Sequence, residues 1–414
     1  MSIHASTVLA RSSTAILSHI TQLSKLYPDH PLAFSLSPNV QPQDLSKLVK
    51  SLTEFSSQSI GCLSAPLPGS TSQNLISCSL AIFDPEQTVL FRSEIAGKAS
   101  PQVGRWHAFR KKDDPPSQIE GQEELKEGVN WGDVWNRNTA DTPLPPELQT
   151  LNTNSVNEVI FFSDRAPEGL NNSLKAFASA SKLGLFAAST PFITGRPFTL
   201  FHNKSIYESG AVGLVLKNTS WSRRAIARSE FIGLSPISPQ MIVTKCEGNM
   251  VNSLDKSNPA QLLLDAMEKS GMDMAGYTSF KDGEKFSLGT IKNEKLSQIY
   301  NITAGDPSRG NISLESQNAP IVGTKVQFFH RPKSGLEIPK RFSSASPKTL
   351  AFIVSPESSP KINDDPETDE ISHLLPDTFL ASSENGFVMS RSDGKVEPAW
   401  ACTVPGGLAS LEWS

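Results

Sequence analysis

The stretch LGLFAASTPFITGRPFTLFHNKSIYESGAVGLVL, residues 183–216, carries the pattern that decides the fold. An apolar run at Leu183–Ala187 leads into small polar residues and a loop with glycine and proline. Two further apolar runs follow, Phe198–His202 and Ser205–Leu216, and Asn203-Lys204 between them is typical of a turn. The stretch therefore predicts a strand, a polar loop and a pair of strands.

The first half of the chain repeats this organisation. Residues 30–96 and residues 157–217 both read as strand, helix, strand, small polar loop ending in proline, and strand pair. The fragments CLSAP (62–66) and AASTP (187–191) occupy the same place in the two copies. A sheet with helices on one face leaves its other face apolar, so we expect the two sheets to pack against each other.

Two phrases carry a family resemblance. The spacing FHN followed by GAVG, at residues 201–213, resembles the end of the N-terminal half of the FIST domain. The phrase VTKCEGNMVNSLDKSNPAQLLLDAM, residues 243–267, is similar to the opening of the FIST C-terminal half. The family occurs in bacterial signalling proteins and in a eukaryotic F-box protein that serves a ubiquitin ligase. The resemblance implies sensing or recognition, and we expect a protein without an F-box, because the predicted first helix leads directly into the FIST-like region.

The expected fold is α/β (α+β), with pseudo-duplicated layered sheets, helices on their outer faces, and a smaller α+β domain after them. We place the first domain at residues 1–224 and the second at residues 225–414. Two polar, proline-containing segments, 111–149 and 355–377, are expected to be loops. Trp131 and Trp135 in the first loop either pack on the protein's own surface or anchor a partner.

The N-terminal segment has two interpretations. Residues 1–28 lack Asp and Glu and are rich in Ser and Thr, a composition typical of a mitochondrial transit peptide. The alternative is a structural helix before the first strand. Five apolar side chains fall at helical spacing there, and Pro28 ends the pattern: Leu9, Ile16, Ile20, Leu23 and Tyr27. We expect the helix and a cytoplasmic or nuclear protein, with a mitochondrial location as the alternative.

Composition excludes several classes of protein. The 414-residue chain has a net charge of −4 and scattered Lys and Arg, which argues against a nucleic-acid surface. No apolar run approaches the roughly 20 residues of a membrane span. The four cysteines form no CxxC, and reduced thiols in an intracellular protein are the expected state.

No pattern for a reaction stands out. The chain contains no Walker A sequence and no G-x-S-x-G, and its seven histidines are dispersed without an i, i+4 pair. GAVG at 210–213 has no helix behind it and indicates close strand packing. We therefore expect no catalytic residue, metal or cofactor. The enzymatic alternative is a layered hydrolase with an N-terminal nucleophile, for which Ser2 and Thr7 fit poorly because a helix is expected there.

The two matched loops, Gly61–Gly69 and Ala187–Pro197, are the candidate ligand site because each follows a buried strand. Hydroxyl and amide groups can hydrogen-bond a ligand, and a guanidinium can bind a carboxylate through two hydrogen bonds. The candidate residues are Ser64, Ser189, Thr190, Arg196 and Asn203. The family pattern at the second loop is Gly-Gly-Ser followed by small and acidic residues, and this chain lacks those glycines and the acid.

The sequence thus favours a non-enzymatic recognition protein in intracellular signalling or protein turnover. Its expected partners are a small metabolite such as an amino acid, a protein, or both. The alternatives are a hydrolase-like enzyme on a layered α/β scaffold and a mitochondrial protein.

Overall fold

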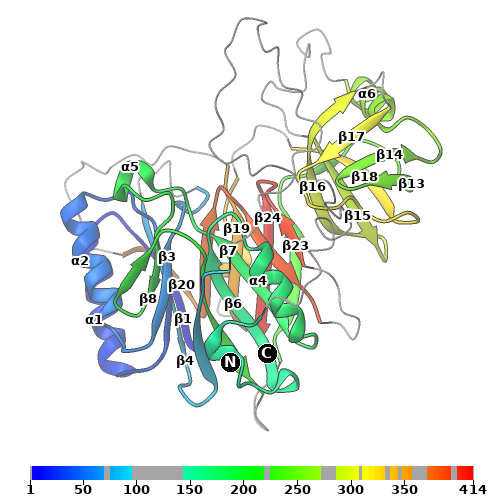
Figure 1. Cartoon of the computed structure of the whole chain (residues 1–414). Coiled ribbons are helices and arrows are strands. Elements are labelled where there is room, and N and C mark those ends of the chain that lie inside the picture. The colour runs from blue at the N-terminus through cyan, green and yellow to red at the C-terminus, as the bar shows by residue number, and fades with distance from the viewer. Residues whose placement is uncertain are drawn as a thin grey trace, which may run out of the picture.

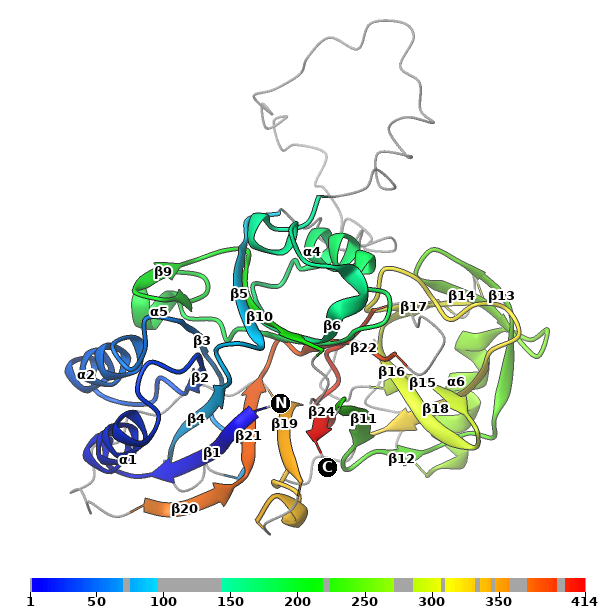
Figure 2. The ribbon, with the colours of Figure 1, turned by 90° about the horizontal axis from the view of Figure 1, so that it is seen from below.

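The computed structural model describes residues 2–69, 75–95, 143–218, 224–271, 286–306, 310–331, 336–343, 347–356, 371–392 and 399–413. Within them the chain forms four sheets. Three of the sheets surround one hydrophobic core, and the fourth curls into a small barrel at one side (Figures 1 and 2). Residues 111–142, with Trp131 and Trp135, and residues 357–370 lie outside the described residues.

The first sheet contains a strand that was expected to be helical. Residues Ser2–Ala10 form strand β1, so the predicted helix was wrong at Leu9, and helix α1 covers Ser13–Leu26. The side chain of Ser12 caps α1 by accepting a hydrogen bond from the amide of Thr14. Both faces of β1 are buried, in different hydrophobic clusters, so its sequence lacks the alternation that marks a half-exposed strand.

The first repeat consists of β1 and four further segments: β2 (Leu32–Leu36), α2 (Pro42–Thr53), β3 (Ser59–Leu63) and β4 (Ile76–Phe83). Its strands lie in the order β1-β4-β2-β3, with β2 and β3 parallel. Helices α1 and α2 cover the outer face of this sheet, as expected (Figure 1). Pro42 opens α2, where its missing N–H costs no helical hydrogen bond.

The second repeat has the same strand order. Its segments are β5 (Thr88–Ser93), β6 (Val156–Ser163), α4 (Glu168–Ser173), β7 (Ser181–Phe186) and β10 (Ala211–Lys217). They pair as β5-β10-β6-β7, with β6 and β7 parallel. One of the two expected strand pairs was wrong, and the other was confirmed only in part, because β8 (Leu200–His202) pairs with Ser205–Tyr207 across the Asn203-Lys204 turn as predicted, but the rest of the second strand does not. Strands β4 and β5 belong to different sheets, and Ser205–Leu216 divides between β9 (Ser205–Tyr207) and β10, also in different sheets.

A third repeat was not expected. Its strands are β11 (Ile226–Phe231), β19 (Lys348–Val354), β21 (Thr378–Ser383) and β24 (Gly407–Trp413). They pair as β11-β24-β19-β21, with β19 and β21 parallel, which is again the order first, fourth, second, third. The barrel lies in the sequence between the first and second strands of this repeat, and this insertion hid the pattern.

The barrel is built from seven strands and helix α6. Its segments are β12 (Ser235–Pro236), β13 (Met241–Glu247), β14 (Met250–Leu254), α6 (Pro259–Lys269), β15 (Phe286–Lys292), β16 (Lys295–Asp306), β17 (Asn311–Leu314) and β18 (Lys325–His330). Pairing of β15 with both β16 and β18 curls the sheet on itself. Pro259 is the first residue of α6, as predicted, and Asn258 caps the helix.

The inner faces of the three repeat sheets share one core. Phe162 of the second repeat packs on Phe352 and Phe379 of the third, with ring centroids 6.0 and 6.3 Å away. The first-repeat sheet contributes small side chains, among them Ala33 and Ala81. Each sheet therefore has its apolar inner face covered by two other sheets, whereas the sequence predicted one partner.

The repeats also exchange strands. After its third strand, the second repeat contributes β8 (Leu200–His202) to the edge of β3, and the third contributes β22 (Phe387–Ser390) to the edge of β7. The first repeat pairs Ala65 with Ser382 of β21, which completes the cycle. Strand β20 (Ile371–Pro376), inside a segment expected to be loop, pairs with β1. The domain division at residue 224 remains a prediction, but the sheets combine strands from both sides of it.

Candidate functional site

The two loops expected to form the site lie together. The amide of Ala188 donates to the carbonyl of Leu63 at 3.0 Å, so the loop after β7 runs beside the end of β3. A third loop, Glu384–Gly386 after β21, joins them, because the amide of Phe186 donates to the carbonyl of Gly386 at 3.0 Å. The carboxyl ends of the three parallel strand pairs thus meet in one place.

The third loop supplies polar groups that sequence reasoning missed. A carboxylate oxygen of Glu384 accepts from the amide of Ser189 at 2.7 Å, and the side-chain amide of Asn385 donates to the carbonyl of Ala187 at 2.8 Å. The signal was present in the sequence as SSENG after a buried strand, at residues 382–386, a small polar run like CLSAP and AASTP. An acidic residue, absent from the second loop, therefore comes from the third.

Three of the five candidate residues hold the backbone in place. The buried Ser64 hydroxyl accepts a hydrogen bond from Ser35 at 2.6 Å. The buried Thr190 hydroxyl donates to the carbonyl of Arg196 at 3.0 Å. Asn203 sits at a positive φ of 55°, and its side-chain oxygen accepts from the amide of Ser59 at 3.0 Å. The contacts of Ser64 and Asn203 reach neighbouring strands, and the contact of Thr190 closes the loop that contains α5.

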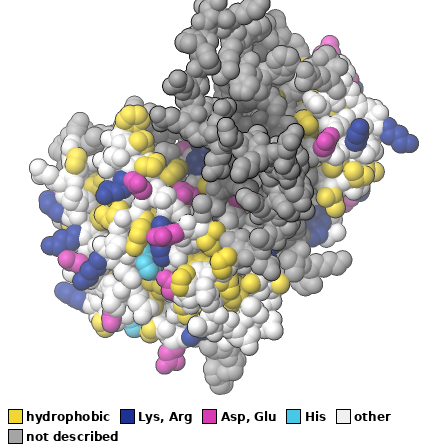
Figure 3. Space-filling model, in the orientation of Figure 1, with side chains coloured by type: hydrophobic (Ala, Val, Ile, Leu, Met, Phe, Trp, Pro, Cys, Tyr) yellow, Lys and Arg dark blue, Asp and Glu magenta, His cyan; other side chains and the backbone are white. Residues whose placement is uncertain are grey.

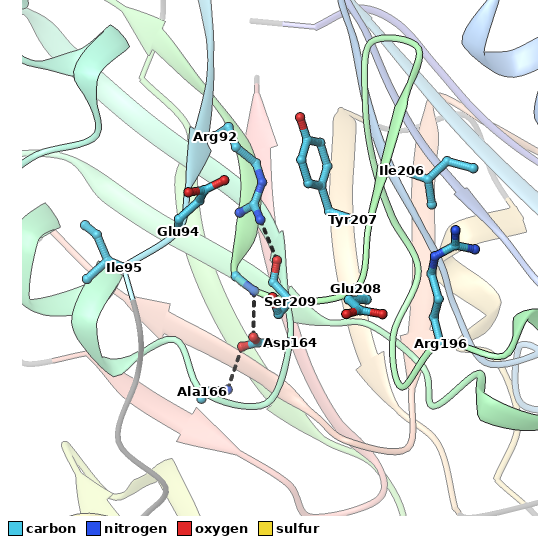
Figure 4. A pocket seen from close by; sticks show the side chains of 11 residues that line it. Arg92, Glu94, Ile95, Asp164, Ala166, Arg196, Ile206, Tyr207, Glu208 and Ser209 are labelled. Carbon is cyan, nitrogen blue, oxygen red and sulfur yellow. Dashed lines mark hydrogen bonds between the residues drawn. The ribbon is translucent and has the colours of Figure 1, made fainter.

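The other two candidates are accessible. Ser189 is exposed, and Arg196 is half-buried on the loop after the short helix α5 (Pro191–Thr194). Arg196 lines an open pocket of about 670 Å³ at the end of β5, the start of β10 and strand β9 (Figure 4). The lining residues are Arg92, Glu94, Ile95, Asp164, Ala166, Arg196, Ile206, Tyr207, Glu208, Ser209 and Gly210.

Arg92 on β5 is bound to the protein through both terminal nitrogens of its guanidinium. Its Nη1 donates to the carbonyl of Ala211 at 2.9 Å, and its Nη2 donates to the carbonyl of Ser209 at 2.6 Å. The guanidinium carbon lies 4.3 Å from the centre of the Tyr207 ring, a cation–π contact. Burial lowers the pKa of Arg92, and the carboxylate of Glu94 opposes that shift. Arg92 therefore forms a wall of the pocket.

Asp164 has a comparable structural role. One of its carboxylate oxygens accepts from the amide of Gly210 at 2.6 Å, and the other accepts from the amide of Ala166 at 2.9 Å. The first repeat has an equivalent hydrogen bond between its second and fourth strands, in which the hydroxyl of Ser37 accepts from the amide of Ser77 at 2.8 Å. The recurrence assigns Asp164 to joining the second and fourth strands of its repeat.

Three charged groups of the pocket remain available. Among the described residues, the guanidinium of Arg196 and the exposed carboxylates of Glu94 and Glu208 make no hydrogen bond or ion pair. Figure 4 shows Arg196 and Glu94 on opposite sides of the pocket. A guanidinium can bind a carboxylate, and a carboxylate can bind an ammonium group. The arrangement therefore suits a small molecule that carries both charges.

The described residues provide no group of three or more metal-ligating side chains. All four cysteines are unpaired, and burial raises the pKa of Cys78 and of Cys402 to about 12, which keeps both thiols protonated at neutral pH. Ser2 and Thr7, considered above as nucleophiles, are buried in β1, and the Thr7 hydroxyl donates to the carbonyl of Thr378 at 2.8 Å.

The accessible surface has mixed charge. On the face in Figure 3, Lys and Arg side chains are interspersed with Asp and Glu. Beside the pocket, α5 exposes Phe192 fully, and Ile193 and Ile206 are also exposed. Of the helices in the described part of the chain, none is long and apolar enough to cross a membrane.

The comparison with curated proteins gave no match to this chain. The FIST N domain, in contrast, matches residues 32–257, which include every residue that lines the pocket. The match begins at β2 and ends just before α6, so it spans the second repeat completely and enters the barrel. It covers more than half of the 414 residues, and the chain therefore belongs to the FIST family.

Proposed function

We propose that this protein is a recognition protein that binds a small zwitterionic metabolite, such as an amino acid, in the pocket at β5, β9 and the α5 loop. The observation that carries the proposal is the presence in one pocket of charges of both signs, on Arg196, Glu94 and Glu208, that make no hydrogen bond or ion pair among the described residues. The volume of about 670 Å³ lies within the range of ligand pockets. The association of the FIST domain with signal transduction supports a sensory role.

The test is a thermal-shift screen of the full chain against free amino acids and monocarboxylic acids. Ligand at 100 times its Kd stabilises the folded state by about 2.7 kcal/mol, which raises the melting temperature by a few degrees. In Arg196→Ala, the affinity for the ligand should fall at least tenfold because the carboxylate loses its partner. The matched control is Lys204→Ala, an exposed cation on the β8–β9 turn that does not line the pocket.

Silence of the whole panel, or a ligand whose affinity is the same in Arg196→Ala, would refute the proposal. In that event the exposed apolar side chains beside the pocket favour the second candidate function, recognition of a protein partner. Its test is recovery of a partner by the full chain and loss of that partner in Phe192→Ser, with Leu26→Ser on the distant end of α1 as control.

A further inference from the structure

We infer that the ligand of this pocket carries two cationic groups and one carboxylate, as a diamino acid such as lysine or ornithine does; the inference rests on the proposed function. The lining residues include two arginines and three carboxylates, a formal net charge of −1. A ligand with one ammonium and one carboxylate would leave that excess negative charge unpaired.

The charges already used by the protein can be separated from those left for a ligand. Arg92 donates to backbone carbonyls, and Asp164 accepts from backbone amides, so both have partners without a ligand. These two side chains carry opposite charges. The three remaining groups are one guanidinium and two carboxylates. A ligand that pairs each of them carries one negative and two positive charges, a net charge of +1.

The placement of these groups fits a molecule with charged ends and an alkyl centre. Arg196 and Glu208 belong to the side formed by the α5 loop and β9, and Glu94 belongs to the end of β5 on the other side (Figure 4). An α-carboxylate and α-ammonium can meet the first two, while the distal ammonium meets Glu94. Ile95 and Ile206 line the same pocket and provide apolar surface for the methylene chain.

The experiment is calorimetric titration of the full chain with three probes. Lysine carries all three charges, norleucine has a chain of the same length without the distal ammonium, and cadaverine lacks the carboxylate. Lysine is expected to bind at least tenfold more tightly than either of the others. Added salt should weaken lysine binding most, because the charged contacts are solvent-accessible.

Variants assign each charge to its side chain. Glu94→Gln should remove the preference for lysine over norleucine and leave the affinity for norleucine unchanged. Glu208→Gln should weaken both, and Arg196→Gln should weaken both but leave cadaverine unaffected. The control is Glu86→Gln, an exposed carboxylate on the β4–β5 turn outside the pocket. Melting temperatures of the unliganded variants confirm that each is folded.

The outcomes separate the two proposals. Equal binding of norleucine and lysine, with loss of both in Arg196→Gln, would overturn the diamino ligand and leave the zwitterion site standing. Tight cadaverine binding that Glu94→Gln abolishes and Arg196→Gln does not would overturn the requirement for a carboxylate. Failure of every amino acid to bind would refute the proposed function itself.

Discussion

Gly210 sits where the pocket meets the first residue of β10. Its φ is +79°, in the left-handed region that favours glycine, and its amide donates to the carboxylate of Asp164. A Cβ atom at this position would lie 2.3 Å from the carbonyl oxygen of Ser93, which belongs to the backbone of β5 and cannot move aside alone. The glycine therefore permits the close approach of β5, β6 and β10 that shapes the pocket wall.

Gly210→Ala should destabilise the protein by about 3 kcal/mol, the sum of left-handed strain and the forced shift of a packed strand. Gly195→Ala is the matched control, because its φ of +73° is similar and nothing lies within 4 Å of the added Cβ. The control should lose only about 1 kcal/mol. Urea unfolding of the two variants measures the difference, and equal losses would show that the Ser93 contact is unimportant.

A shared hydroxyl links α1 to β1. Nε2 of His4 on β1 and Nε2 of His19 on α1 each lie 3.0 Å from the Ser6 hydroxyl oxygen. A hydroxyl with one proton can donate to one ring and accept from the other when both imidazoles are neutral. Burial lowers the pKa of both histidines, and the neighbouring His4 lowers the pKa of His19 further.

This arrangement predicts a loss of stability in acid. In the unfolded chain the histidines titrate near their ordinary pKa of about 6.5, and in the folded protein they titrate lower. The unfolded chain thus binds more protons, and the stabilisation present above that pH is lost as the pH falls through the folded pKa. Thermal unfolding midpoints should decrease between about pH 7.5 and about pH 5.5, the range in which histidine titrates. The decrease should be smaller in His19→Gln.

The control is His373→Gln, an exposed histidine on β20. His202, whose pKa burial also lowers, remains in all three proteins and contributes equally to each profile. An identical acid response in wild type and His19→Gln would exclude the shared hydroxyl as its source.

Local patterns predicted the elements more reliably than their partners. The runs at Leu32–Ser37 and Glu158–Ser163 became strands because each is a continuous apolar segment bounded by polar residues. The predicted hairpin with Phe198–His202 is correct for Ser205–Tyr207, but the rest of that segment forms β10, whose partners β5 and β6 lie far away in sequence and could not be found in the same way. The third repeat was hidden by the inserted barrel.

For the candidate site, too, the sequence indicated local features better than the contacts between them. Residue type drew attention to the loops after β3 and β7, and the structure places these loops together. Sequence does not reveal that the hydroxyls of Ser64 and Thr190 already have partners within the protein. The sequence also does not reveal that Glu94 and Glu208, which lie outside the loop of Arg196, line the same pocket as Arg196. Those facts depend on tertiary contacts.

The described part of the molecule is a ring of three repeats in which the edge at the third strand of each repeat is paired with a segment of another repeat. The two termini lie near each other (Figure 1), because Lys348 pairs in register with Trp413 and its Nζ donates to the carbonyls of Ser2 and Ile3. A ring of this kind has no repeat that can leave without exposing the edge of its neighbour. We therefore expect the repeats to unfold together.

A circular permutant tests this expectation. A short glycine–serine linker would join Trp413 to Ser2, and new termini would open between Pro85 and Glu86, which are exposed on the β4–β5 turn. The permutant should fold and unfold in one transition, with every strand pair of the ring retained. The control is the unpermuted chain with the same linker added after Trp413. Two separate transitions, or a permutant that does not fold although the control does, would contradict the closed ring.

The exchange of strands also dictates when the protein can fold during its synthesis. The first two repeats lie before residue 218, but β1 and β7 obtain their outer partners from β20 and β22, beyond residue 370. At roughly 10 residues per second, the ribosome needs on the order of 15 seconds to deliver them. During that interval the outer edges of β1 and β7 lack their final partners, and we expect the nascent chain to be prone to pairing with other chains until the last strands emerge.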